Sequence, residues 1–148
     1  MKTKTIYVLR HGETDLNKKG MVQGRGVNAS LNDTGRLQSK KAFEALKDKP
    51  IKTIFTSSLN RSIETVAPWR NGEVSIYSHD GFDEISWGNQ EGKEASYEAK
   101  NLYADTVKGW QEGNLDLNVG GGESPIQVMK RQQEAMEYVF EKGEEHTL

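Results

Sequence analysis

Cysteine is absent from this chain of 148 residues, so disulfides, thiolate nucleophiles and cysteine-based metal sites are all excluded. Proline and histidine are scarce, with three of each. No stretch approaches the roughly 18 consecutive apolar residues of a membrane-spanning helix, and the first residues lack the apolar core of a signal peptide. These absences predict a cytoplasmic protein without a membrane partner.

Neither sign of charge dominates the sequence. The chain has 20 Lys and Arg against 22 Asp and Glu, for a net charge of -2. This balance gives no electrostatic reason to expect nucleic acid as a partner. Hydrophobic residues make up only 34%, but three Trp, five Tyr and four Phe argue against disorder. The length predicts a single domain over residues 1–148.

Short β-branched segments alternate with helical patterns in the first half of the chain. The expected elements are a buried strand (5–9), a loop with three glycines (14–30), a helix capped by Asn32 or Asp33 (to 47), a strand (51–56), a helix (59–68) and a weaker strand (74–77). The first helix should bury Leu37, Ala42, Phe43 and Leu46. Such alternation is typical of a parallel α/β sheet with right-handed crossovers.

The second half is more polar and carries one well-signalled helix. An apolar-acidic loop (81–88), a polar helix (93–110) and a glycine-rich turn (113–122) come first. Ser124, Pro125 and Gln127 then occupy the N-cap, first and third positions of a capping box, and Gly143 ends the helix. Its expected apolar face comprises Val128, Met129, Met136, Val139 and Phe140.

Basic residues stand where two of the expected strands end. Arg10 and His11 follow the first strand, and Arg61 lies in the first turn of the helix after the second. Carboxyl ends of parallel strands share one edge of a sheet, where such folds bind ligands. Arginine offers phosphate two parallel hydrogen bonds, and neutral histidine is a nucleophile. With Asn17 as an amide donor, these residues predict a phosphoryl-binding site.

Each candidate also has a plainer interpretation that the residues alone leave open. Arg10 and His11 would suit a polar strand end, and Arg61 would suit an ion pair with Glu64 one helical turn away. Asn17 is equally typical of a turn, and Glu84 of a solvated loop.

Four motifs, in order, resemble those of the histidine phosphatase superfamily, also called phosphoglycerate-mutase-like. The first is Arg-His-Gly-Glu-Thr at residues 10–14, with Asn17 three residues on. The second is the Ser-Leu-x-Arg-x-x-x-Thr pattern at residues 58–65. The third is Glu-x-x-x-Gly-x-x-Glu-Gly at residues 84–92, and the fourth is Gly-Glu-Ser at residues 122–124. These motifs cover nearly the whole chain.

The resemblance implies a three-layer α/β/α sandwich with a mostly parallel sheet and a phosphohistidine mechanism. His11 would attack phosphorus, and Glu84 would protonate the leaving oxygen and then activate water. The residues implied in phosphate binding are Arg10, Asn17, Gln23, Gly24 and Arg61. No cofactor or metal is implied, and the expected partner is a small phosphorylated substrate or inorganic phosphate.

One family feature is missing from the sequence. The family has a second histidine, in a His-Gly dipeptide at the end of a later strand, whereas His79 and His146 are not followed by glycine. His146-Thr147-Leu148 resembles the start of that strand, which predicts the second histidine a few residues after Leu148. A fragment of a longer protein is the favoured explanation, and a natural short form is the alternative. If the chain is naturally this short, we expect low stability and edge pairing with a second copy.

Three functions remain open at this stage. Only 38 residues separate Glu84 from Glu123, which resembles the phosphatase branch more than the mutases, whose covering insertion is longer. A phosphatase is therefore the first interpretation, and a phosphoglycerate mutase the second. A catalytically impaired phosphate-binding pseudoenzyme or interaction module is the third. Oligomers are possible, and the sequence does not name the substrate.

Overall fold

The computed structural model describes residues 3–148. Four parallel strands form one sheet in the order β1-β4-β2-β3. Their bounds are β1 Thr5–Ile6, β2 Thr53–Thr56, β3 Ser75–Ser78 and β4 His146–Thr147. The α-helices are α1 Asp15–Lys18, α2 Asp33–Leu46, α3 Asn60–Thr65, α4 Tyr97–Gln111 and α5 Pro125–Lys142. Three 3₁₀ helices complete the fold: η1 Ala67–Asn71, η2 Asp80–Phe82 and η3 Gly88–Gln90.

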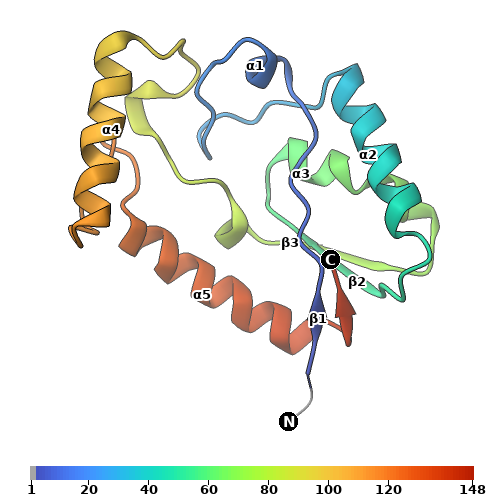
Figure 1. The fold of residues 1–148 in the computed structure, drawn as a ribbon. Coiled ribbons are helices and arrows are strands. Elements are labelled where there is room, and N and C mark those ends of the chain that lie inside the picture. The colour runs from blue at the N-terminus through green and yellow to red at the C-terminus, as the bar shows by residue number, and fades with distance from the viewer. Residues whose placement is uncertain (1–2) are drawn as a thin grey trace.

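Helices lie on both faces of the sheet, as expected for the predicted α/β class (Figure 1). Ile54 in β2 is fully buried and belongs to the core cluster with Trp69 of η1, against which Phe43 of α2 packs edge-on. The next residue, Phe55, points to the opposite face and packs against Tyr138 of α5. Successive side chains of a strand alternate between faces, so one short strand joins both helical layers.

β4 is the central element that joins the two halves of the sheet. Its register pairs His146 with Thr5 in β1 and Thr147 with both Ile6 and Thr53. The predicted start of a strand at His146 is therefore confirmed, and it lies beside the first strand. Thr147 is 1% exposed, in keeping with this central position.

The first strand differs from the prediction. Strand pairing covers only Thr5–Ile6, and the apolar residues expected to be buried are exposed: Ile6 by 41%, Val8 by 91% and Leu9 by 37%. The Tyr7 N–H still donates to the Thr147 carbonyl at 2.8 Å and the Tyr7 side chain packs against the core, but Val8 and Leu9 belong to no paired strand and are exposed.

Helix termini follow their local signals, and the buried faces agree with the prediction in part, since Ala42, Phe43 and Leu46 pack against the core and Val139 is buried. Asn32 caps α2 by accepting a hydrogen bond from the Gly35 N–H, and Ser124 and Gln127 form the capping box of α5. Leu37, Met129 and Phe140 were expected on buried faces but are 53%, 62% and 58% exposed. Small residues take the closest positions instead, with Gly35 and Ser39 buried in α2 and Ala135 in α5.

The loop expected over residues 14–30 contains the short helix α1. From residue 3 to residue 148, no helix is long and apolar enough to cross a membrane.

Candidate active site

The His11 ring is oriented by the backbone that follows it. Its Nδ1 lies 2.8 Å from the Gly12 carbonyl oxygen. A carbonyl only accepts hydrogen bonds, so Nδ1 carries the proton and donates, and Nε2 of the neutral ring keeps its lone pair. The tautomer thus leaves Nε2 as the nucleophilic nitrogen.

Several groups act on the charge of this ring. Burial, the largest influence, lowers the pKa of His11, and the positive charges of Arg61 and Arg10 lower it further. The Gly12 carbonyl and the Glu84 carboxylate oppose these effects, but the pKa stays below its ordinary value. The neutral ring is therefore favoured at neutral pH.

Arg61 is a buried guanidinium, 1% exposed, in the first turn of α3. Its Nη1 donates to the Val27 carbonyl at 2.7 Å, and its Nη2 donates to the Gly24 carbonyl at 3.3 Å. The same Nη2 lies 3.1 Å from Oε2 of Glu84. The alternative pairing with Glu64 is not found, since Glu64 accepts a hydrogen bond from the Leu31 N–H.

Thr65 connects α3 to the loop that carries His11. Its hydroxyl accepts a hydrogen bond from the Gly12 N–H at 2.9 Å and donates to the Arg61 carbonyl at 2.6 Å. Ser39 of α2 donates to the Thr65 carbonyl at 2.6 Å. These buried bonds hold His11 and Arg61 in a fixed relation, because α3 supports both.

Gln23 and Asn17 meet at Thr14. The Thr14 hydroxyl lies 3.0 Å from Oε1 of Gln23 and 3.1 Å from Oδ1 of Asn17. Asn17 also accepts from the Thr14 N–H and forms the capping box of α1, so the structure gives it the role of a turn residue. Gln23 is 6% exposed, and its Nε2 is buried without a hydrogen-bond partner among the described residues.

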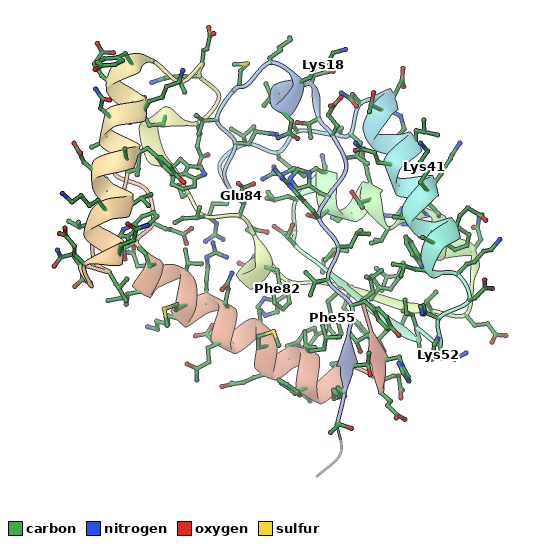
Figure 2. The ribbon with its side chains drawn as sticks, viewed as in Figure 1. Lys18, Lys41, Lys52, Phe55, Phe82 and Glu84 are labelled. Carbon is green, nitrogen blue, oxygen red and sulfur yellow. The ribbon has the colours of Figure 1, made fainter. Side chains whose placement is uncertain are left out.

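Glu84 lies on the segment between β3 and α4, near the centre of the molecule in Figure 2, with Phe82 below it on the same segment. Its side chain is 42% exposed and pairs with the buried Arg61. The structure therefore brings His11, Arg61 and Glu84 into one cluster, with Arg10 close enough to act on the His11 ring.

A cavity of about 330 Å³ opens beside His11. Its lining is mostly apolar and comes from the chain after β1, the end of β2, α3, α5 and β4. The polar members besides His11 are Thr56, Ser57, Ser62, Thr65 and Thr147. Between residues 3 and 148, no group of three metal-ligating side chains comes together.

Two arginines near the candidate site were not predicted from the sequence. Arg25 bonds to Glu123 and lies 3.5 Å from Asp83, and Arg131 of α5 bonds to Glu123 and to carbonyls of the loop that carries Glu84. Arg25 stands between two glycines and Arg131 in a polar run of helix, so neither carries a local signal. Glu123 carries such a signal, because it belongs to the Gly-Glu-Ser motif.

Comparison with known proteins gives concordant results. A probable phosphatase of Schizosaccharomyces pombe is 39% identical over 110 residues, covering 73% of this chain and 52% of the relative. Phosphoglycerate mutase-like protein 4 of Arabidopsis thaliana is 29% identical over 141 residues, covering 93% of this chain and 60% of the relative. This chain thus spans between half and three fifths of the length of these relatives.

A solved structure, YhfR of Bacillus stearothermophilus, superimposes with a TM-score of 0.80 at 27% identity, covering 99% of this chain and 72% of that one. The superposition covers nearly the whole chain, including α3, which carries Arg61. Residues 6–148 match the sequence profile of the histidine phosphatase superfamily, branch 1, and the chain belongs to that family.

Proposed function

We propose that this protein is a phosphomonoesterase that hydrolyses a small phosphorylated metabolite through a phosphohistidine on His11. The observation that carries the proposal is the His11 ring, neutral, with Nδ1 bonded to the Gly12 carbonyl and Nε2 available for attack. The buried charge of Arg61 and the carboxyl of Glu84 stand beside it.

The first step forms a phosphoenzyme. Nε2 of His11 attacks phosphorus, and the P–N bond forms as the bond from phosphorus to the leaving oxygen breaks. Glu84, protonated, gives its proton to that oxygen. Arg61 and Arg10 compensate the charge on the phosphoryl oxygens. A phosphate at Arg61 competes with Glu84 for Nη2, which releases the carboxyl toward the leaving group.

The second step hydrolyses the phosphoenzyme and restores the free enzyme. Glu84, now a carboxylate, takes a proton from water as the water oxygen attacks phosphorus, and the P–N bond breaks. One carboxyl thus acts first as acid and then as base. Inorganic phosphate leaves, and His11 is again neutral.

Gln23, Gly24 and Asn17 are proposed to complete the phosphate site. The unpartnered Nε2 of Gln23 supports a donor role, because a buried amide N–H without an acceptor is costly and is retained where a ligand accepts from it. Gly24 acts through its carbonyl on Arg61, which it orients. Asn17 spends its side-chain oxygen on Thr14, and its amide nitrogen would serve as the donor.

The test uses p-nitrophenyl phosphate with a chelator present, followed by an alkaline quench that preserves phosphohistidine. Wild-type protein should accumulate phosphohistidine and release nitrophenolate. His11→Asn should bind inorganic phosphate but form no phosphoenzyme and lose at least about 10³-fold in turnover. Turnover by His11→Asn at the wild-type rate would disprove the mechanism.

A mutase is the second candidate, favoured by the Arabidopsis relative named phosphoglycerate mutase-like. It predicts transfer of the phosphoryl group between the hydroxyls of phosphoglycerate without release of inorganic phosphate. Release of phosphate in preference to isomerisation supports the phosphatase. Phosphate binding with no phosphoenzyme would instead identify a phosphate-binding module.

A further inference from the structure

Arg131 of α5 uses its whole guanidinium to hold the segment that carries Glu84. Nη1 donates to the carbonyls of Gly81 and Asp83, both at 2.8 Å. Nη2 donates to the Glu84 carbonyl at 3.3 Å. Nη1 also has a longer contact with the Asp80 carbonyl at 3.5 Å, and the remaining contacts go to Glu123, from Nε at 2.8 Å and from Nη2 at 3.0 Å. An arginine has five N–H donors, and each has an acceptor here.

Glu123 holds the backbone on the C-terminal side of Glu84. Its Oε2 accepts a hydrogen bond from the Ser86 N–H at 2.9 Å. The backbone is therefore fixed at Asp83, immediately before Glu84, and at Ser86, two residues after the acid Glu84. Both members of the pair are nearly buried, with side chains 14% and 15% exposed, so water competes little for these bonds.

The positive charge of Arg131 stabilises the ionised form of Glu123. Burial favours a higher pKa for Glu123, but the hydrogen bonds from Arg131 and Ser86 and the charges of Arg131 and Arg25 outweigh it and hold that pKa below its ordinary value. Glu123 is therefore ionised throughout the neutral range, and the bidentate pair persists.

The opposite flank of the segment is also anchored. Asp83, 4% exposed, accepts hydrogen bonds from the N–H and hydroxyl of Ser58, both at 2.8 Å, where the chain enters α3. The Glu84 side chain is 42% exposed, and among the described residues its one polar contact is with Arg61. Its position therefore depends on this contact and on the backbone that carries it.

We propose that Arg131, acting with Glu123, is a positioning residue that sets the place of the Glu84 carboxyl. The inference rests on the proposed function, in which Glu84 is the proton donor. A displacement of a catalytic group by about 1 Å costs around 10²-fold in rate. Arg131 makes no direct hydrogen bond to His11 or Arg61, so we expect its effect to reach the reaction through the segment that carries Glu84.

The experiment measures the rate of phosphoenzyme formation for two substrates that differ in their need for an acid. Nitrophenolate leaves p-nitrophenyl phosphate without a proton, whereas the alkoxide of glycerol 3-phosphate needs one. Arg131→Gln should slow phosphorylation by glycerol 3-phosphate about 10- to 100-fold and leave phosphorylation by p-nitrophenyl phosphate within about threefold. Lys130→Gln, the exposed neighbour on α5, is the matched control and should match wild type.

A double-mutant cycle separates positioning from a general structural role. In a Glu84→Gln background, Arg131→Gln should cause no further loss with glycerol 3-phosphate, because the group it positions is already gone. Equal losses with both substrates, additive losses in the cycle, or wild-type rates in Arg131→Gln would each overturn the inference.

Two further variants guard against misfolding. They are used if thermal unfolding shows that Arg131→Gln damages the fold. Arg131→Lys keeps the charge without the planar fork, and Glu123→Gln keeps the shape without the charge. Each should slow phosphorylation by glycerol 3-phosphate more than phosphorylation by p-nitrophenyl phosphate, but less strongly than Arg131→Gln does. Failure of the proposed function has a different signature. In that case Glu84→Gln alone would leave phosphorylation by glycerol 3-phosphate unchanged.

Discussion

At the scale of single residues, the site depends on which nitrogen of His11 carries the proton. The hydrogen bond to the Gly12 carbonyl selects the tautomer, and burial favours the neutral ring. The charge of Arg61 beside it lowers the pKa of His11, and in the proposed mechanism the same charge compensates the phosphate. A neutral nucleophile next to fixed positive charge is what attack on a phosphate anion requires.

The lowered pKa of His11 predicts how the ring titrates. Its NMR titration midpoint should fall below 6.5, the ordinary value, and the resonance is assigned by its loss in His11→Ala. In the proposed mechanism the neutral form is the nucleophile, so phosphorylation should decline only as the pH drops through this lowered pKa and should be insensitive to histidine protonation at pH 7. A midpoint above 6.5 would show that the flanking carboxylate, not burial, governs the ring.

The Thr65 hydroxyl is the acceptor for the buried Gly12 N–H. Thr65→Val should lower the free energy of unfolding by about 1–3 kcal/mol, because that N–H then lacks a partner. Thr65→Ser keeps the hydroxyl and should lose less. Urea denaturation measures both, and a Val variant as stable as the Ser variant would show that the bond does not matter.

At the scale of elements, the site is assembled where α2, α3 and the end of the first strand meet. Gly12 and Gly35 touch through their backbones, since a Cβ on Gly12 would lie 2.6 Å from the Gly35 carbonyl oxygen. A Cβ on Gly35 would lie 2.8 Å from the Glu13 nitrogen. This approach of α2 to the His11 loop is possible only without side chains at these two positions.

Gly35→Ala tests that close approach. Alanine is favoured over glycine in a helix by about 1 kcal/mol, but here the clash with backbone should dominate and destabilise the protein by about 1–3 kcal/mol. Phosphoenzyme formation should fall as well, because the His11 loop must shift. Gly72→Ala, where the nearest atom to a Cβ is 3.4 Å away, is the matched control and should be nearly neutral in thermal unfolding. A Gly35→Ala protein more stable than wild type would contradict the packing.

At the scale of the whole molecule, the segment after β1 stands out as exposed apolar chain. β1 is an edge strand in the order β1-β4-β2-β3, and Ile6, Val8 and Leu9 are uncovered beside the cavity next to His11. Exposed apolar strand edges pair readily with other chains unless charge prevents it.

If the protein is naturally this short, we therefore expect self-association through this edge. Sedimentation velocity over a range of concentrations should show association of the wild-type chain. Val8→Lys should reduce it without lowering thermal stability, since Val8 is 91% exposed. Tyr97→Lys, at a position 76% exposed on α4, should leave association unchanged. A wild-type chain that is monomeric at every concentration would contradict the prediction.

Much of the fold was predictable from local chemistry. Asn32 and Ser124 mark helix starts because their side chains satisfy backbone N–H groups only a few residues away. The exposure of Leu37 and Met129 was not predictable, since helical periodicity shows which residues share a face but not what covers that face. In α2, contact with α3 falls on Ser39, whose hydroxyl is bonded there.

For the site, the sequence by itself predicted the candidate groups. A histidine and an arginine after one strand, and a second arginine after another, follow from residue type and spacing, which are local properties, whereas the acid in a later loop follows from its resemblance to a family motif. Only the tertiary structure decided that Arg61 pairs with Glu84 across 23 positions, and that Arg131 and Glu123 hold the Glu84 backbone. Such contacts depend on how helices pack on the sheet, and packing distances are not encoded in any short stretch of chain.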